Sequence, residues 1–523
     1  MTGPEKIVRW PLPLAVIWLL VPLVGIVVRV SLEPILPYDY WWALAMGRII
    51  ALSGEIPTTN LFLYTLEADA PFHNQPWLAQ WMLYELYAAA GHAGLAVMRN
   101  ALVAFSWLAV VVLALRRCPD ARVVGGLALA VVFVGGGPLF AVRTQLFALV
   151  PFVVTLALLV EIADGRMQRK MLWLLVPLTV LWANLHGTFI LALVMVGCVG
   201  AGLLLEQFLE RRTWPVRAGL IWGGALLATA LAALINPQGV RLYGYVIGLV
   251  RQVEVALKVA EWQPPDPSSD FGILITVTFV ASMVVLALRF KAVRLWEVLL
   301  FCAMAILAMS AIRSLFWWAA VMLVIVAPHL RALFRISSAG ADRVSVGQGV
   351  VHLVVASALV VATVLAQPGQ ALHSFLNVSS SSWARRTGPG QGVLHVKSCV
   401  SLVRLLAERG YPGQIFHYQA IGGLLEFELS AAEKPRAVSF VDQRMEIISA
   451  KIWDDYFAIS STSPGWQDLV EIYGIETFVL EFEGQWRLIQ ELEASADWTR
   501  VWLDEAQVMF FKAEALETIT RWR

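Results

Sequence analysis

Residues 187–212 read GTFILALVMVGCVGAGLLLEQFLERR, an apolar run that ends in two arginines. A bilayer core of about 30 Å requires about 20 mostly apolar residues in a helix, and residues 187–209 meet that requirement. Similar runs recur along the chain. The eleven predicted spans lie near residues 11–30, 95–115, 122–141, 145–162, 171–186, 187–209, 217–235, 271–289, 295–311, 313–330 and 349–367.

The composition is that of a polytopic membrane protein. Of the 523 residues, 59% are hydrophobic and 15% are charged, and the mean hydropathy is +0.70. A soluble domain carries about 25% charged residues, so this chain lacks the charge that a water-exposed surface requires. The net charge of +1 excludes nucleic-acid binding through bulk positive charge. The four cysteines have no metal-site spacing, and we expect no disulfide framework.

Basic residues occupy every second connection between the predicted spans. They are Lys6 and Arg9; Arg116, Arg117 and Arg122; Arg166, Arg169 and Lys170; Arg211, Arg212 and Arg217; Arg289, Lys291 and Arg294; and Arg331, Arg335 and Arg343. Because short basic loops stay in the cytoplasm, we expect a cytoplasmic amino terminus and an extracytoplasmic carboxyl terminus. The longer connections 31–94 and 236–270 and the tail then lie outside.

The sequence predicts two domains: a membrane domain over 1–367, with the long external loop 31–94, and an extracytoplasmic α/β domain over 368–523. In the tail, we expect helices at 399–409, 446–458 and 466–474, and strands at 414–418, 436–441, 476–482, 498–503 and 507–512. Strands that alternate with helices favour an open sheet covered by helices. Asp504 and Glu505 are predicted to form a hairpin turn, and Gly422-Gly423 a bend.

Asp39 is the first candidate for chemistry. It begins the segment 39–48 (DYWWALAMGR), whose apolar positions recur at helical spacing, as in an amphipathic helix lying on the membrane surface. Trp41 and Trp42 suit the headgroup zone. One interpretation makes Asp39 the helix N-cap; the other makes it a base or metal ligand at the lipid–water boundary.

The remaining candidates stand in the predicted external connections or at the ends of spans. They are Asn74, Gln75, Arg143, Asn184, His186, Asn236, Glu261, Asp266 and Arg313. Ionisable groups near membrane depth tend to mark functional paths, and arginines suit a phosphate. Structural alternatives stay open: snorkelling for Arg143 and Arg313, packing for His186, tethering for Asn74 and Gln75, a helix stop for Asn236, and a solvated turn for Glu261 and Asp266.

Several of these segments resemble the GT-C superfamily, whose members are integral-membrane glycosyltransferases that use polyprenyl-phosphate-linked sugars. The similarity, which is closest to a bacterial branch, rests on 39–48, 184–187 (NLHG), Asn236-Pro237 and 261–264 (EWQP). In the tail it rests on 415–423 (IFHYQAIGG) and 440–444 (FVDQR). It departs from the superfamily at Ala43, where many members have His, and at Gln75-Pro76, where many have further acids.

The resemblance implies a multi-pass protein of the bacterial plasma membrane that transfers a sugar to a glycan, lipid or protein acceptor outside. It implies that Asp39 is the catalytic base, with Mg²⁺ or Mn²⁺ as an optional cofactor, and that Arg143 and Arg313 hold the donor phosphate. We expect Trp42, Asn74, Gln75, Asn184, His186 and Glu261 to complete the binding site. A non-catalytic envelope-assembly protein and a transporter of lipid-linked substrates are the alternatives.

Overall fold

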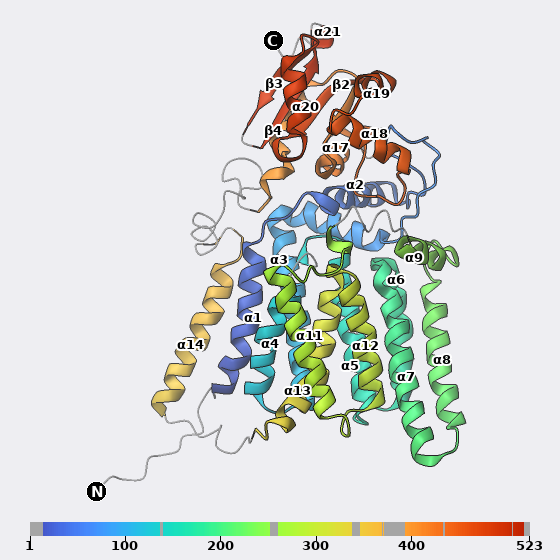
Figure 1. Cartoon of the computed structure of the whole chain (residues 1–523), viewed down its shortest axis with the longest axis vertical. Coiled ribbons are helices and arrows are strands. Elements are labelled where there is room, and N and C mark those ends of the chain that lie inside the picture. Colours follow the sequence, from blue (N-terminus) through green and yellow to red (C-terminus); the bar gives the residue numbers. More distant parts are fainter. Residues whose placement is uncertain are drawn as a thin grey trace.

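The chain forms a helical bundle with a smaller α/β tail at one end, which we call the outer end of the bundle (Figure 1). A computed structural model describes residues 14–135, 140–251, 260–336, 346–368, 370, 393–431, 435–504 and 506–516. Lys6, Arg9, Arg343 and Glu505 lie outside the described residues. The predicted fold class, a mostly α membrane bundle with a carboxyl-terminal α/β part, is confirmed.

Eight helices among the described residues are long and apolar enough to cross a membrane. They cover α1 (Leu14–Leu32), α3 (Trp77–Arg117), Thr144–Ala163, Gly187–Arg211, α8 (Val216–Ala233), α11 (Asp270–Leu288), Ile312–Leu333 and Gly347–Leu365, the last within α14 (Val346–Leu365). Three of these spans contain α5 (Leu149–Ala163), α7 (Ile190–Arg211) and α13 (Leu315–Leu333). Three further helices in the bundle are shorter: α4 (Ala121–Gly135), α6 (Leu175–Leu185) and α12 (Leu295–Ser310). The protein is thus multi-pass, and the count of eleven spans stays a prediction.

The basic loops meet acidic side chains at the end of the bundle away from the tail. Arg117 pairs with Glu297 and, at 2.9 Å, with Asp164, while Arg294 lies 3.0 Å from Glu206. The Glu297 carboxylate also lies 3.1 Å from the His329 ring. Pairing of opposite charges offsets the free-energy cost of removing them from water. The charged side chains at this end of the bundle therefore compensate one another.

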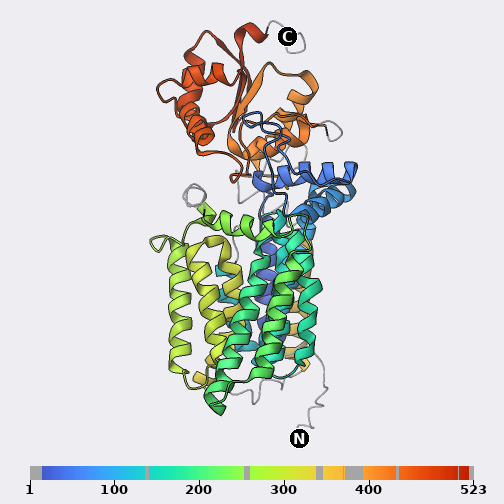
Figure 2. The same cartoon turned by 90° about the vertical axis from the view of Figure 1, so that its right-hand side faces the viewer.

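Helix α2 (Tyr38–Ser53) lies between the bundle and the tail (Figures 1 and 2). The predicted helix is confirmed, and Trp41 and Trp42, which were predicted to suit the headgroup zone, are both buried within the protein. A Cβ on Gly47 would lie 2.1 Å from the carbonyl oxygen of Gln80 in α3, and one on Gly423 would lie 2.4 Å from the backbone nitrogen of Trp42. Glycine therefore permits a close approach on both sides of α2.

The tail contains a four-stranded mixed sheet of order β1-β2-β4-β3. Strands β1 (Gln414–His417) and β2 (Ile475–Glu481) are parallel, with Phe416 opposite Phe478. Strands β3 (Trp498–Leu503) and β4 (Gln507–Lys512) form an antiparallel hairpin. The helices of the tail are α16 (Val400–Arg409), α17 (Gly422–Leu429), α18 (Ala450–Ser460), α19 (Trp466–Ile472), α20 (Phe482–Ala494) and α21 (Ala513–Leu516). The bend predicted at Gly422-Gly423 is the start of α17, so that prediction is wrong.

The strand predicted at 436–441 is also wrong. The backbone nitrogens of Val438 and Ser439 donate to the carbonyl oxygen of Phe62, and Ser439 returns a carbonyl to the Tyr64 nitrogen. The first external loop thus supplies the backbone partners that a sheet would have supplied. Loop and tail also share an apolar core that includes Trp41, Phe427 and residues of both β1 and β4.

Candidate functional site

Four predicted residues from distant parts of the chain meet at the outer end of the bundle. Asp39 lies in the first turn of α2, Arg143 directly precedes a 3₁₀ helix (Thr144–Ala148), and Glu261 and Arg313 lie in short 3₁₀ helices at Ala260–Trp262 and Ile312–Ser314. Arg143 Nη1 lies 3.6 Å from Asp39 Oδ2 and 2.8 Å from both Glu261 oxygens. Arg313 Nη1 lies 3.7 Å from Glu261 Oε1. We call these four residues the carboxylate–arginine cluster.

Arg143 is buried and incompletely paired. Its side chain is 8% exposed, which does not fit an arginine that snorkels to lipid phosphates. Its Nη1 faces the two carboxylates, whereas Nε and Nη2 are buried and have no hydrogen-bond partner among the described residues. A guanidinium has five donor N–H groups, and a buried donor that makes no hydrogen bond destabilises the folded protein. Free donors on a buried cation are suited to an incoming anion.

Arg313 is held by neighbours that keep it beside Glu261. Its Nη2 donates to Gln145 Oε1 at 3.0 Å, and its guanidinium carbon lies 4.3 Å from the centre of the Trp262 ring. An aromatic face stabilises a cation at that distance. Gln145 and Trp262 were not selected from the sequence; their positions beside Arg143 and Glu261 in the chain were the available signal.

Asp39 is not the N-cap of α2. Pro37 occupies the cap position without a side-chain bond, and Asp39 lies inside the first turn, where a negative charge suits the helix dipole. The N-cap interpretation is therefore wrong, because the helix begins two residues earlier than it required. The Asp39 side chain stays 33% exposed, so it remains open to a ligand.

The two carboxyl groups of the cluster have opposite electrostatic environments. Burial raises the pKa of Asp39, against the attraction of Arg143, and repulsion from Glu261 raises it further. Burial also raises the pKa of Glu261, but Arg143 and Arg313 together outweigh it and leave that pKa below its usual value. Neighbouring groups whose pKa values are driven apart often divide acid–base roles. Asp39 suits proton transfer, and Glu261 suits a permanent counter-ion.

Asn184 and Gln75 are engaged with their surroundings. Asn184 Oδ1 accepts from Trp77 Nε1 at 2.7 Å and from Asn236 Nδ2 at 3.1 Å, and Asn184 Nδ2 donates to the carbonyl oxygen of Ile235. Gln75 Nε2 donates to the carbonyl oxygen of Ala183 at 2.6 Å. These bonds tie the external connections together, which favours the tethering interpretation for Gln75 and shows that Asn184 has a similar structural role.

Of the other predicted residues, His186 and Trp42 lie near the cluster. Burial, Arg313 and Arg143 lower the pKa of His186, whose Nδ1 accepts from the Thr188 backbone nitrogen at 3.1 Å. Trp42 follows Asp39 by one helical turn, and its ring lies 6.0 Å from the Arg444 guanidinium in the tail. The buried Asn74 amide has no hydrogen-bond partner among the described residues. Asp266 is exposed and accepts from Ser268.

The described residues contain no group of three or more His, Cys, Asp or Glu side chains able to hold a metal ion. Asp39 and Glu261 are the carboxylates of the cluster, and both face Arg143 Nη1. Mg²⁺ is commonly held by one or two carboxylates together with substrate phosphates. A cation between these two carboxylates would have to displace the guanidinium, so the residues do not fit a preformed metal site.

The multi-pass bundle beneath an outer α/β tail has the GT-C fold, which it shares with solved structures of membrane glycosyltransferases. The oligosaccharyltransferase of Archaeoglobus fulgidus in its apo form is similar, with a TM-score of 0.53 and 14% identity over 89% of this chain and 69% of that one. The predicted resemblance to GT-C proteins is confirmed at the level of the fold.

Two further solved structures share the fold. The archaeal oligosaccharyltransferase AglB of Archaeoglobus fulgidus, in complex with an inhibitory peptide and a dolichol-phosphate, has a TM-score of 0.51 at 14% identity, over 89% of this chain and 69% of that one. The arabinofuranosyltransferase AftD from Mycobacteria has a TM-score of 0.50 at 15% identity, over 97% of this chain and 40% of that one. The sequence matches no protein-family profile and no curated protein.

Proposed function

We propose that this protein transfers a sugar from a polyprenyl-phosphate donor to an envelope acceptor on the extracytoplasmic face of a bacterial plasma membrane. The observation that carries the proposal is the buried Arg143, whose unpaired donors lie beside a second arginine and an accessible carboxylate. Arginine binds phosphate oxygens well because its planar fork matches them. The related AglB structure contains a dolichol-phosphate, which supports a lipid phosphate as the donor group.

In the proposed reaction an acceptor hydroxyl oxygen attacks the anomeric carbon of the donor sugar. The bond between that carbon and the phosphate oxygen breaks, and the electron pair leaves with the polyprenyl phosphate. Asp39 takes the proton of the acceptor hydroxyl as general base. Arg143 and Arg313 stabilise the charge that develops on the leaving phosphate, and Glu261 balances the arginines before the donor binds.

The rest of the proposed binding site is formed by Trp42, His186, Asn74, Gln75 and Asn184. Asn74 brings a buried amide without a partner in the described residues, and a neutral His186 brings a ring that does not repel the arginines. Gln75 and Asn184 act by holding the external connections in place. The division into a membrane domain over 1–367 and an outer domain over 368–523 is part of the same proposal, as are the cytoplasmic amino terminus and the glycan, lipid or protein nature of the acceptor.

The proposed donor site is tested by native mass spectrometry of the protein extracted from its own membranes. The wild type is compared with Arg143→Gln, Arg313→Gln and the control Arg29→Gln. Arg29 pairs with Glu33 at 3.4 Å on a partly exposed surface, so its loss removes an arginine without touching the cluster. We expect a bound mass that matches a polyprenyl phosphate in the wild type and in Arg29→Gln, and its loss in both cluster variants. Ordinary phospholipids alone in all four samples would contradict the donor site and favour an assembly protein.

A further inference from the structure

The tail contains a cavity at the carboxyl ends of its two parallel strands. Tyr418, Gln419 and Ala420 follow β1, while Glu481 ends β2 and Gln485 lies in the following helix α20. The cavity has a volume of about 270 Å³, close to the lower end of the ~300–1,000 Å³ of small-molecule sites. Ligands of open α/β sheets bind outside the carboxyl ends of the strands. The place and the size fit a small ligand.

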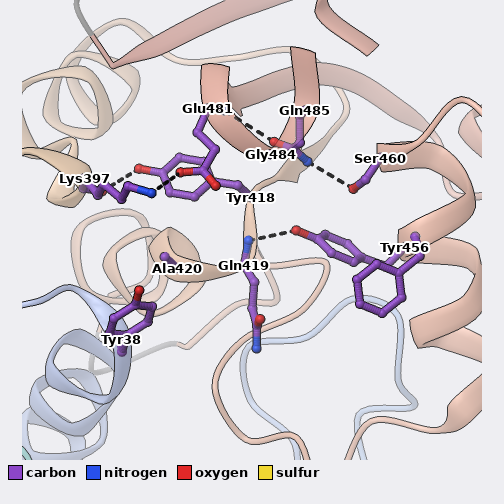
Figure 3. A pocket seen from close by; sticks show the side chains of 11 residues that line it. Tyr38, Lys397, Tyr418, Gln419, Ala420, Tyr456, Ser460, Glu481, Gly484 and Gln485 are labelled. Atoms are coloured by element: carbon purple, nitrogen blue, oxygen red, sulfur yellow. Dashed lines mark hydrogen bonds and ion pairs between the residues drawn. The ribbon is translucent and has the colours of Figure 1, made fainter. Parts of the chain in front are cut away.

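Aromatic rings supply the apolar part of the lining. Figure 3 shows Tyr38 and Tyr456 on opposite sides of Gln419. Phe457 also lines the cavity, and Phe457 and Tyr38 are 45% and 50% exposed. Exposure of apolar ring surface to water is unfavourable in free energy, and a ligand that covers the rings removes that cost. Tyrosine combines an apolar face with a polar hydroxyl group, so it can contact both kinds of ligand surface.

Amide and hydroxyl groups between the rings are fixed by bonds to one another. The backbone nitrogen of Gln419 donates to Tyr456 Oη at 2.9 Å, and Gln485 Nε2 donates to Ser460 Oγ at 3.1 Å (Figure 3). Such bonds hold the lining in one geometry before a ligand arrives, which reduces the entropy lost on binding. Amides and hydroxyls donate and accept in close alternation, as a molecule with several hydroxyl groups requires.

The charges of the cavity disfavour an anionic ligand. Lys397 is the one cation among the described residues that line it, and its Nζ lies 3.1 Å from Glu481 and 2.8 Å from Glu483. Two carboxylates therefore compensate this ammonium group. A phosphate or carboxylate would meet a net negative charge here, unlike at the carboxylate–arginine cluster. These charges favour a neutral ligand over an anionic one.

The cavity adjoins the proposed base. Tyr38 lines it and directly precedes Asp39 at the start of α2, so the two Cα atoms are about 3.8 Å apart. Asp39 contacts Arg143 in the bundle, whereas Tyr38 reaches the residues that follow β1 in the tail. Two consecutive residues of α2 thus connect the carboxylate–arginine cluster to the cavity.

We propose that this cavity binds a neutral sugar ring of the acceptor and brings it to Asp39 from the tail side. That the bound sugar is the acceptor rests on the proposed function; that the cavity binds a neutral sugar does not. The binding of sugar is therefore measured separately from transfer, with no donor present.

The probes are methyl glycosides of glucose, galactose, mannose and arabinose, with glucose 6-phosphate as the anionic comparison. Saturation-transfer NMR and titration are carried out on the full-length protein in lipid nanodiscs, because maltoside detergents carry sugar themselves. The variants are Tyr38→Ala and Phe457→Ala. Trp486→Ala is the matched control, because Trp486 is 51% exposed in α20 and does not line the cavity.

We expect at least one methyl glycoside to bind with a roughly millimolar Kd. Tyr38→Ala and Phe457→Ala weaken it by about tenfold, the loss of an aromatic contact, and Trp486→Ala leaves it unchanged. Asp39→Asn retains binding, so a failure of transfer is distinguished from a failure of the cavity. The proposal would be overturned if no glycoside bound, or if Tyr38→Ala and Phe457→Ala both bound the glycoside as tightly as the wild type does. Tighter binding of glucose 6-phosphate than of methyl glucoside would overturn it as well.

Discussion

Asp39 and Glu261 share the Arg143 guanidinium, and a single substitution is expected to separate their effects. Glu261 raises the pKa of Asp39 by repulsion and also competes for Arg143. Glu261→Gln removes both effects, so the pKa of Asp39 falls. A general base works when deprotonated, and its activity is lost as pH falls through its pKa. We therefore expect the acid limb of the kcat/KM profile for transfer to move to lower pH.

The control for this measurement is Asp266→Asn, in the same external connection. Asp266 is exposed and accepts from Ser268 rather than from an arginine, so its substitution leaves the acid limb in place. An acid limb that stays fixed in Glu261→Gln, or that moves to higher pH, would show that Asp39 does not set the profile.

The position of Arg143 also predicts that transfer does not depend on a metal ion. Its guanidinium occupies the space between the two carboxylates of the cluster, so transfer is expected to survive EDTA with an unchanged rate. The assay compares EDTA-treated protein with the same sample after addition of excess Mg²⁺ or Mn²⁺. Loss of activity in EDTA, with recovery on adding Mn²⁺, would instead assign Asp39 and Glu261 to a metal-binding role.

At the scale of elements, α2 is positioned by backbone contacts that only glycine allows. A Cβ on Gly47 would lie 2.1 Å from the Gln80 carbonyl oxygen, so Gly47→Ala must separate α2 from α3. Overpacking of this kind costs about 1–3 kcal/mol. We expect a lower melting temperature in scanning fluorimetry and slower transfer, because Asp39 lies on the same helix.

Gly126→Ala is the matched control, since a Cβ at that position in α4 meets nothing within 4 Å. Alanine is the better helix former, so the melting temperature stays equal or rises. Equal stability of Gly47→Ala and Gly126→Ala would contradict the tight packing of α2.

Elements with strong local periodicity could be predicted, and those that depend on distant partners could not. The strands at 498–503 and 507–512 match β3 and β4, because each run is short and rich in aromatic and branched side chains. The run 436–441 has the same local character, but Phe62 and Tyr64 take its backbone bonds. Helix α20 was missed because its charged residues mask a single apolar face, formed by Leu488, Ile489 and Leu492.

The residue types of the candidate site could be predicted from the sequence, whereas the contacts between their side chains could not. The basic loops predict one orientation of the spans, and that orientation assigns Asp39, Arg143, Glu261 and Arg313 to the same side. Which groups pair is decided by side-chain packing between segments more than 100 residues apart, and no local pattern encodes that. The same limit explains why Gln145 and the tail cavity were not predicted.

At the scale of the whole molecule, the proposed orientation is tested by two exposed positions at opposite ends of the bundle. Ser268 precedes α11 on the side of the tail, and Thr213 lies between α7 and α8 (Figure 1). Ser268→Cys is expected to react with a membrane-impermeant maleimide on intact cells, and Thr213→Cys only after permeabilisation. The unmodified chain is the control for its own cysteines. Labelling of Thr213→Cys on intact cells would reverse the topology.

The proposed mechanism depends on the bundle holding the donor while Asp39 serves the acceptor that comes from the tail side. The most direct measurement compares wild type and Asp39→Asn in a transfer assay with a polyprenyl-phosphate sugar and membrane-derived acceptor, with bound donor lipid followed in the same samples. We expect Asp39→Asn to lower the transfer rate by about 10²–10⁴-fold, as loss of a general base does, while the donor lipid stays bound. A variant that transfers sugar at the wild-type rate would contradict it.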